Sequence, residues 1–248
     1  MKRYKIVTLA LAMLLLLSGV GVLLYPTIHR EQQAVQSERT VQAFLQEHES
    51  QTTLPQIVVT DESQETEPVV LPYADLLQAM RDYNAEIYAN GQAGLVDPWA
   101  YTSEVINPAD YGLEGEAVAV LTIPKMELQE PVYLGATKAH LNSGIAQLSI
   151  SSMPIGGENT NCVLAGHRGW DGALFFRHIE VLEVGDELTL TNLWETLTYR
   201  VAEIKIIQPY QAEEVLIQSG RDLLTLITCH PYGSGGRYRY VVFCERVP

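Results

Sequence analysis

The stretch Leu223-Leu224-Thr225-Leu226-Ile227-Thr228-Cys229-His230-Pro231-Tyr232 decides the fold. Its first seven residues, rich in Leu, Ile and Thr, favour a buried β-strand. Pro231 has no amide hydrogen to donate, so it ends the ladder just after the cysteine. We therefore expect a strand that brings Cys229 to its C-terminal edge, where a site can be built.

A cysteine in such a strand needs further support before it is assigned to catalysis. Free cysteines are commonly inert core residues, and a nucleophilic one requires a nearby base or cation to form the thiolate. Side chains alternate along a strand, so His230 points away from the face that carries Cys229. His167 is a better candidate base, because it follows the expected strand 161–166 in a loop between Gly166 and Gly169.

Arg239 is the candidate for the cation that the cysteine needs nearby. It opens an apolar run, where a guanidinium must be paired or lie at a rim. The short connection Gly233-Ser234-Gly235-Gly236 makes residues 237–243 the natural antiparallel partner of 223–229. This hairpin places a permanent positive charge beside the thiol. Arg237 has the same strand parity and remains the alternative.

Short strand signals follow one another from Ala117 onward. They predict a mainly β fold, a closed or nearly closed β-barrel of about 130 residues, with brief helical patches such as 173–178. The expected strands cover 118–123, 131–134, 146–148, 161–166, 187–190, 195–207, 223–229 and 237–243.

The chain before the barrel divides into three parts. Residues 1–28 carry Lys2, Arg3 and Lys5 and then about nineteen uncharged residues, Ile6 to Leu24, which predict a transmembrane anchor with a cytoplasmic N-terminus. A cleaved signal peptide is the alternative. Residues 29–72 predict a juxtamembrane amphipathic helix that acts as a stalk, followed by an acidic tether. Residues 73–116 predict a second amphipathic helix and a proline-containing segment, and 117–248 the barrel.

Net charge and cysteine content limit the kinds of ligand and disulfide that the chain can be expected to have. A net charge of −14 without clustered Lys or Arg argues against a nucleic-acid interface. Cys162, Cys229 and Cys244 are an odd number, so at least one thiol stays unpaired within the chain. No Cys-x-x-Cys motif or histidine cluster is present in the sequence, so we expect no metal and no cofactor.

These residues resemble a known family. Thr228-Cys229-His230-Pro231-Tyr232, followed by Arg239-Tyr240-Val241-Val242, is similar to the signature strand pair of the sortases, membrane-anchored cysteine transpeptidases of Gram-positive bacteria with an eight-stranded barrel. The order His, Cys, Arg also matches. Further similar segments are Ile123-Pro124-Lys125, Met153-Pro154-Ile155-Gly156-Gly157-Glu158-Asn159, Gly166-His167-Arg168-Gly169, Phe175-Phe176 and Val184-Gly185-Asp186.

The resemblance implies a role for each site residue. Cys229 would attack the carbonyl between Thr and Gly of an LPxTG-like sorting signal, and His167 would protonate the departing amine. Arg239 would stabilise the tetrahedral oxygen or hold the substrate backbone. The catalytic domain would then lie outside the cell, with surface proteins as its partners.

Asp97-Pro98-Trp99 resembles the lid motif of class C, the pilin-polymerising sortases. In that class the lid aspartate meets the active-site region and the lid aromatic covers the thiol, and the accepting amine is a pilin lysine. A sortase of another class, which anchors proteins to peptidoglycan, is the alternative. A non-catalytic, membrane-tethered β-barrel that serves as a binding module is a remote one.

Two departures from the class pattern are visible. Arg239 lies one residue further from the cysteine than is usual in the family, and the intervening loop lacks the usual asparagine. Many class C members also carry a second, C-terminal membrane helix, whereas this sequence stops at Pro248. Either the protein lacks that helix or the sequence is truncated.

Overall fold

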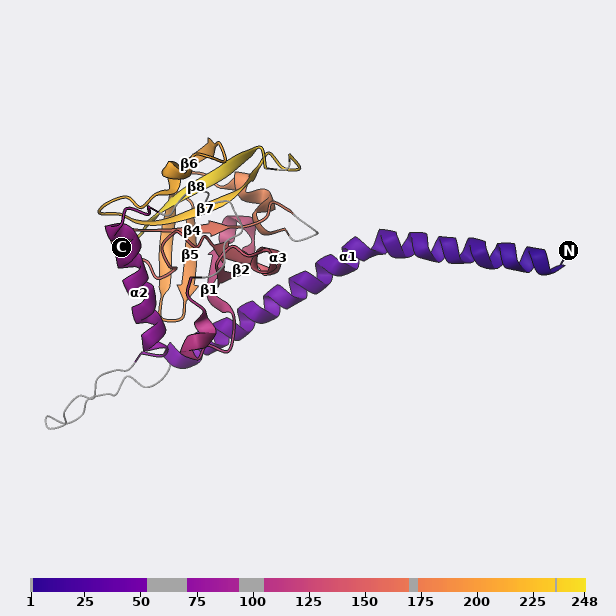
Figure 1. Cartoon of the computed structure of the whole chain (residues 1–248), viewed down its shortest axis with the longest axis horizontal. Helices are drawn as coiled ribbons and strands as arrows, with labels where there is room; N and C mark the ends of the chain where they lie inside the picture. The colour runs from indigo at the N-terminus through magenta and orange to yellow at the C-terminus, as the bar shows by residue number, and fades with distance from the viewer. Residues whose placement is uncertain (1, 53–70, 94–104, 170–173, 235) are drawn as a thin grey trace.

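Eight strands close into a barrel in the computed structural model, which describes residues 2–52, 71–93, 105–169, 174–234 and 236–248 (Figure 1). The strands follow one another around the barrel in the order β1-β2-β3-β4-β7-β8-β6-β5. Their bounds are Ala117–Ile123 (β1), Leu128–Leu134 (β2), Ile145–Gln147 (β3), Thr160–Ala165 (β4), Glu187–Asn192 (β5), Thr196–Ile207 (β6), Asp222–His230 (β7) and Tyr238–Arg246 (β8).

The predicted mainly β fold is confirmed, and each expected strand overlaps an observed one. The hairpin predicted from the glycine-rich connection is present, since β7 and β8 pair antiparallel. β7 also pairs with β4, in parallel. The short helices between the strands are η1 (Pro108–Tyr111), η2 (Pro124–Met126), α3 (Lys138–Ser143), η3 (Phe175–Val181) and η4 (Ala212–Val215).

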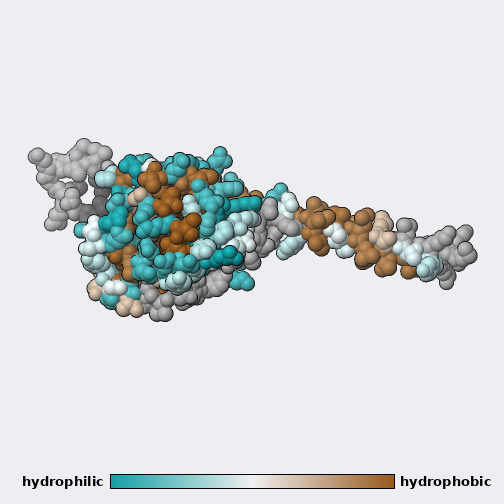
Figure 2. Space-filling view, turned by 90° about the horizontal axis from the view of Figure 1, so that it is seen from above, coloured by the Kyte–Doolittle hydropathy of each residue, from teal (hydrophilic) through white to brown (hydrophobic). Residues whose placement is uncertain are grey.

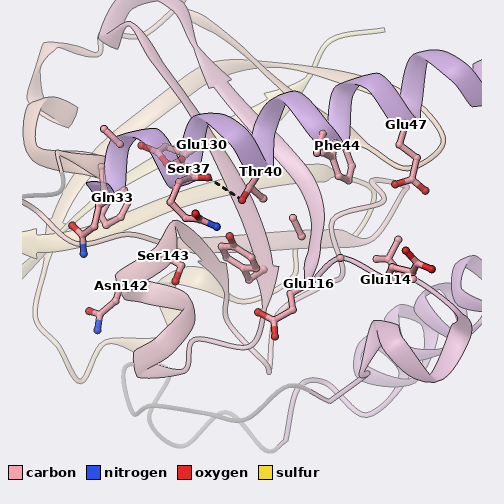
Figure 3. Close-up of a pocket in the computed structure, with 18 of the residues that line it drawn as sticks. Gln33, Ser37, Thr40, Phe44, Glu47, Glu114, Glu116, Glu130, Asn142 and Ser143 are labelled. Carbon is pink, nitrogen blue, oxygen red and sulfur yellow. Dashed lines mark hydrogen bonds between the residues drawn. The ribbon is translucent and has the colours of Figure 1, made fainter. Parts of the chain in front are cut away.

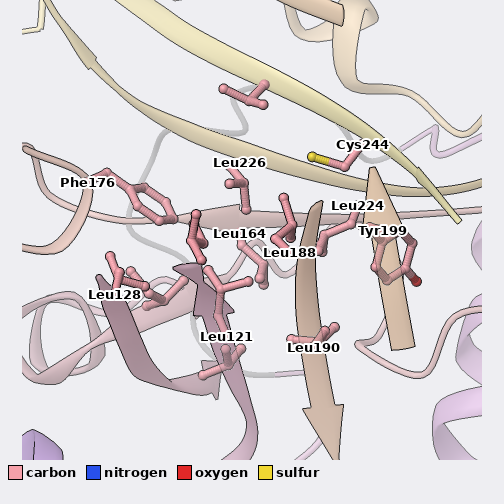
Figure 4. Packing of buried hydrophobic residues seen from close by; sticks show 14 of the residues in the cluster. Leu121, Leu128, Leu164, Phe176, Leu188, Leu190, Tyr199, Leu224, Leu226 and Cys244 are labelled. Carbon is pink, nitrogen blue, oxygen red and sulfur yellow. The ribbon is translucent and has the colours of Figure 1, made fainter. Parts of the chain in front are cut away.

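The barrel interior is filled by alternate side chains of the strands. Leu224 and Leu226 of β7 meet Val242 and Cys244 of β8 in this cluster (Figure 4). Removing such a side chain from water stabilises the fold by about 1.5–3 kcal/mol. Ile227 belongs instead to a second cluster on the outer face of the sheet. Because side chains alternate, Cys229 lies on the same outer face as Ile227.

The helix α2 (Ala74–Ala89) packs beside the barrel (Figure 1). Leu76 and Met80 are fully buried in a cluster that also contains residues of β1 and β2. The helix ends where Gly91 adopts a φ of 63°, and Gln92 N donates to Ile87 O at 2.9 Å. A left-handed glycine with such a bond is a common helix stop. The predicted amphipathic helix over 74–90 is confirmed.

The helix α1 (Lys2–Thr52) is continuous, where the sequence predicted an anchor and a separate stalk. Val41 and Phe44 are buried in the cluster shared with β1 and β2, so the expected stalk is in part a layer of the domain. Most of the predicted acidic tether lies outside the described residues.

The N-terminal part of α1 extends away from the barrel (Figure 1). It exposes apolar side chains, among them Leu11, Leu14 and Leu17, and Figure 2 shows this part as a largely brown, hydrophobic stretch. Among the residues that the structure describes, no helix has the length and apolar character that are needed to cross a bilayer. The transmembrane helix predicted over 6–24 is therefore not confirmed.

Candidate active site

The three predicted catalytic residues lie on β7, on β8 and in the loop that follows β4, at one rim of the barrel. Cys229 of β7 is the direct partner of Arg239 of β8 in the antiparallel register. On the other side of β7, the parallel register pairs Ala165 of β4 with Ile227. β4 ends there, and Gly166 N, just before His167, donates to Ile227 O at 3.2 Å, which places the start of the His167 loop beside the end of β7. The structure thus brings the thiol, the imidazole-bearing loop and the arginine to one edge.

The guanidinium of Arg239 turns toward the β7–β8 connection. Its Nη1 donates to Gly236 O at 2.7 Å and to Tyr238 O at 3.2 Å. A Cβ built on Gly236 would lie 2.9 Å from Arg239 Nη1 and 3.2 Å from Cys229 Sγ. The cation and the sulfur therefore flank the same backbone position. Arg237 precedes β8 and its side chain is exposed.

Backbone bonds on both sides hold His167 in place. Gly166 N donates to Ile227 O at 3.2 Å, and Phe176 N donates to His167 O at 3.0 Å. Burial of the imidazole lowers the pKa of His167 below its ordinary value, because desolvation disfavours the charged ring. A neutral imidazole at physiological pH can accept the proton of a thiol.

The three cysteines differ in their surroundings. Cys229 is exposed, whereas Cys162 and Cys244 are buried and free. Burial raises the pKa of both interior thiols, so they stay protonated and unreactive. Exposure and strand position make Cys229 the candidate nucleophile among the three.

Two residues that tie the histidine loop to β7 were not assigned roles from the sequence. Thr228 is buried, and its Oγ1 donates to Gly166 O at 2.7 Å. Arg168 is also buried, with its guanidinium directed at the end of β7. A hydroxyl in an apolar strand signals a buried hydrogen bond, which could have pointed to Thr228. An arginine in a glycine-rich loop carries no comparable signal.

The predicted lid residues Asp97 and Trp99 lie outside the described residues. Within the part of the chain that the structure describes, no group of three or more His, Cys, Asp or Glu side chains could hold a metal ion.

A cavity of about 930 Å³ lies between α1 and the barrel (Figure 3), and none of the three catalytic candidates is among the residues that line it. Ser37 of α1 donates to Glu130 of β2 at 2.5 Å, and Figure 3 shows the pair with Glu47 and Glu114 toward the opposite end of the cavity. Burial raises the pKa of Glu130 to about 7, against the smaller opposing effect of the Ser37 bond. Glu130 is thus a titrating group at the contact between α1 and β2.

Comparison with known proteins agrees with this arrangement. A family model described as the Sortase domain matches residues 121–247. Sortase D of Bacillus subtilis (strain 168) is 31% identical over 149 residues, which make up 59% of this chain and 72% of that protein.

Solved structures extend the likeness. Sortase C1 of the GBS pilus island 1 has a TM-score of 0.68 at 28% identity, over 86% of this chain and 92% of that one. Sortase C-1 of Actinomyces oris has a TM-score of 0.62 at 32% identity, over 71% of this chain and 99% of that one. The chain, with an exposed thiol, an imidazole loop and an arginine at one barrel rim, belongs to the sortase family of cysteine transpeptidases.

Proposed function

We propose that this protein is a pilin-polymerising sortase, which cleaves an LPxTG-like sorting signal and joins the acyl product to a pilin lysine. The observation that carries the proposal is the pairing of three adjacent strands, in which Cys229 lies opposite Arg239 and the His167 loop starts beside the end of the cysteine strand. The similarity to sortases C named for pilus islands supports the choice of class.

The chemistry follows from these three side chains. His167 takes the thiol proton of Cys229 as the sulfur attacks the Thr carbonyl carbon of the sorting signal. The tetrahedral intermediate collapses with cleavage of the Thr–Gly C–N bond, and the amine leaves with the proton from His167. The Arg239 guanidinium stabilises the negative oxygen of that intermediate.

The second half-reaction regenerates the enzyme. A lysine amine attacks the thioester carbon and loses a proton to His167. The C–S bond then breaks, an isopeptide bond remains, and the thiolate of Cys229 recovers its proton. Water would divert the thioester to hydrolysis, so the proposal includes a lid in which Asp97 pairs with a cation and Trp99 covers the thiol.

One observation favours a second candidate, a sortase that anchors surface proteins to peptidoglycan. Curated relatives at about 30% identity are named Sortase D and Sortase A. Such an enzyme would use the same three residues with a cell-wall precursor as the amine.

Deleting the gene and blotting surface proteins tests the choice. Loss of a high-mass covalent ladder, restored by the wild-type gene but not by Cys229→Ala, supports pilin polymerisation. An intact ladder together with release of single surface proteins into the medium supports the anchoring function. If an LPxTG-type peptide leaves no acyl-thioester on Cys229 in the purified protein, the binding-module alternative replaces both.

Localisation at the cell membrane, with the catalytic domain outside, is also a proposal. It rests on the uncharged segment 6–24 and on the positive residues that precede it. Protease treatment of intact cells tests it, because an outward-facing barrel is digested while cytoplasmic markers survive. Survival of the barrel would contradict the proposed orientation.

A further inference from the structure

A buried arginine links the histidine loop to the end of the cysteine strand. Arg168 directly follows His167, and its side chain is only 3% exposed. Its Nη1 lies 2.8 Å from His230 Nδ1 and donates to Cys229 O at 3.4 Å. A single guanidinium therefore contacts the backbone of the nucleophile and the residue after it.

The other side of this guanidinium is held by an acidic residue. Arg168 Nη2 forms an ion pair with Glu180 Oε2, from η3. The guanidinium carbon also lies 5.8 Å from the centre of the Tyr240 ring of β8. An arginine is charged at all relevant pH values, and burying its charge is tolerated only with such partners. The Arg168 guanidinium therefore contacts residues of β7, β8 and η3.

The contact with His230 engages one nitrogen of that ring. A guanidinium has only donors, so His230 Nδ1 must be the acceptor. Glu180 Oε1 lies 3.5 Å from the same nitrogen, so Arg168 and Glu180 both contact it. Because Nδ1 of His230 is engaged in these contacts, His167 is the better candidate for the imidazole that serves the thiol.

We propose that Arg168 is a positioning residue for the transpeptidase, which holds the His167 loop against Cys229 through its bonds to the end of β7 and to Glu180. The inference rests on the roles proposed for Cys229 and His167. In this role Arg168 acts through the imidazole next to it and not on the substrate. Small displacements of a catalytic group can lower turnover about 100-fold, so the loss of this tie affects chemistry more than substrate binding.

Alkylation of Cys229 by iodoacetamide tests the proposal without any sorting signal. The wild-type protein, Arg168→Met, His167→Ala and the double variant form a cycle, measured at a temperature where each is folded by circular dichroism. Arg168→Met is expected to slow alkylation about 10-fold and to move its pH profile toward that of His167→Ala. In the His167→Ala background the arginine change should have no further effect, because residues that act as a unit are not additive.

A matched control is Arg200→Met, which breaks an exposed ion pair of 2.6 Å with Glu187 on β5 and should leave alkylation unchanged. A folded Arg168→Met protein with the wild-type rate and pH profile would overturn the proposal. The proposal would also be overturned if the rate losses from Arg168→Met and His167→Ala multiplied in the double variant, because a purely structural role predicts that the two losses are independent.

Glu180→Gln provides a second route if Arg168→Met does not fold, since Glu180 is half exposed and its loss leaves the arginine in place. Glu180→Gln should slow alkylation several-fold, again only when His167 is present. An unchanged rate would refute the proposed positioning by Arg168 and Glu180.

Turnover of an LPxTG-type peptide is measured in parallel. We expect kcat of Arg168→Met to fall about 10- to 100-fold with KM nearly unchanged. If the wild-type protein turns over no such peptide, the proposed function fails, while the alkylation cycle still decides the role of Arg168.

Discussion

Cys229 and Arg239 lie directly opposite each other in the antiparallel ladder of β7 and β8. Opposite residues in such a ladder have neighbouring side chains on the same face of the sheet. The arginine is therefore a fixed neighbour of the thiol, positioned by backbone hydrogen bonds and not by a mobile loop.

This pairing predicts that replacing two nearby arginines by alanine lowers kcat/KM to different extents. Arg239→Ala should lower kcat/KM about 100- to 1000-fold, as expected for the loss of an oxyanion-stabilising donor. Arg237→Ala should lower it less than about 3-fold, because Arg237 is exposed and precedes the ladder. Steady-state kinetics with an LPxTG-type peptide measure both variants. The reverse order would reassign the cation to Arg237.

Gly236 should be intolerant of a side chain for a reason specific to the site. Its φ of 84° already disfavours other residues, and an added Cβ would press against Arg239 Nη1 and Cys229 Sγ. Gly236→Ala is expected to lower kcat at least 10-fold. Gly233→Ala is the matched control, since Gly233 has a φ of 73° with nothing within 4 Å of its Cβ position. Equal losses in both variants would mean that backbone strain alone is responsible.

The pH dependence of the reaction should show the lowered pKa of His167. An imidazole acts as a base only when neutral, and burial keeps His167 neutral below its ordinary pKa of 6.5. We expect the acidic limb of a kcat/KM profile to have its midpoint below pH 6.5 and to disappear in His167→Ala. A midpoint at or above 6.5 would show that burial does not dominate the titration of this ring.

Glu130 should make the stability of the protein depend on pH. Its pKa is about 7 in the folded state, against an ordinary value of 4.5, so the folded protein holds a proton that the unfolded chain releases. This stabilisation is fully present below pH 4.5 and is lost as the pH rises through 7. At about 1.4 kcal/mol for each unit of pKa difference, the loss is on the order of 3 kcal/mol.

Urea unfolding of Glu130→Gln between pH 5 and 8 measures this effect. The variant should show a flatter profile and exceed the wild type in stability at pH 8, because an amide carries no charge to bury. Glu187→Gln changes an exposed glutamate on β5 and should leave the slope as in the wild type. A Glu130→Gln slope equal to that of the wild type would exclude Glu130 as its source.

The proposed lid predicts faster access to the thiol when its residues are removed. Asp97→Ala and Trp99→Ala should each speed alkylation of Cys229 and raise peptide cleavage several-fold, because the cover that excludes reagents is lost. The rate of iodoacetamide modification measures the effect, with Trp194→Ala as a control for loss of a tryptophan elsewhere. Unchanged rates in both lid variants would remove the gating role.

Local patterns accounted for much of the barrel and for one half of the site. The strand signals, the helix over 74–90 and the β7–β8 hairpin depend on neighbours in the sequence, so alternation, turn residues and helical spacing predict them. Arg239 was found by this route, because a short connection leaves the chain few ways to pair. The parity that separates Cys229 from His230 also follows from strand geometry alone.

The sequence by itself therefore determined the strands, the thiol at a strand end and the cation beside it. Only the tertiary structure decided that β4 pairs in parallel with β7 and brings the His167 loop beside the end of the cysteine strand. It also decided that Arg168 is buried against Glu180 and that Val41 and Phe44 of α1 complete a core cluster. The physical reason is that parallel pairing and helix docking join segments far apart in the chain. The free energy of this pairing and docking is the sum of many weak contacts, so no short sequence pattern predicts it.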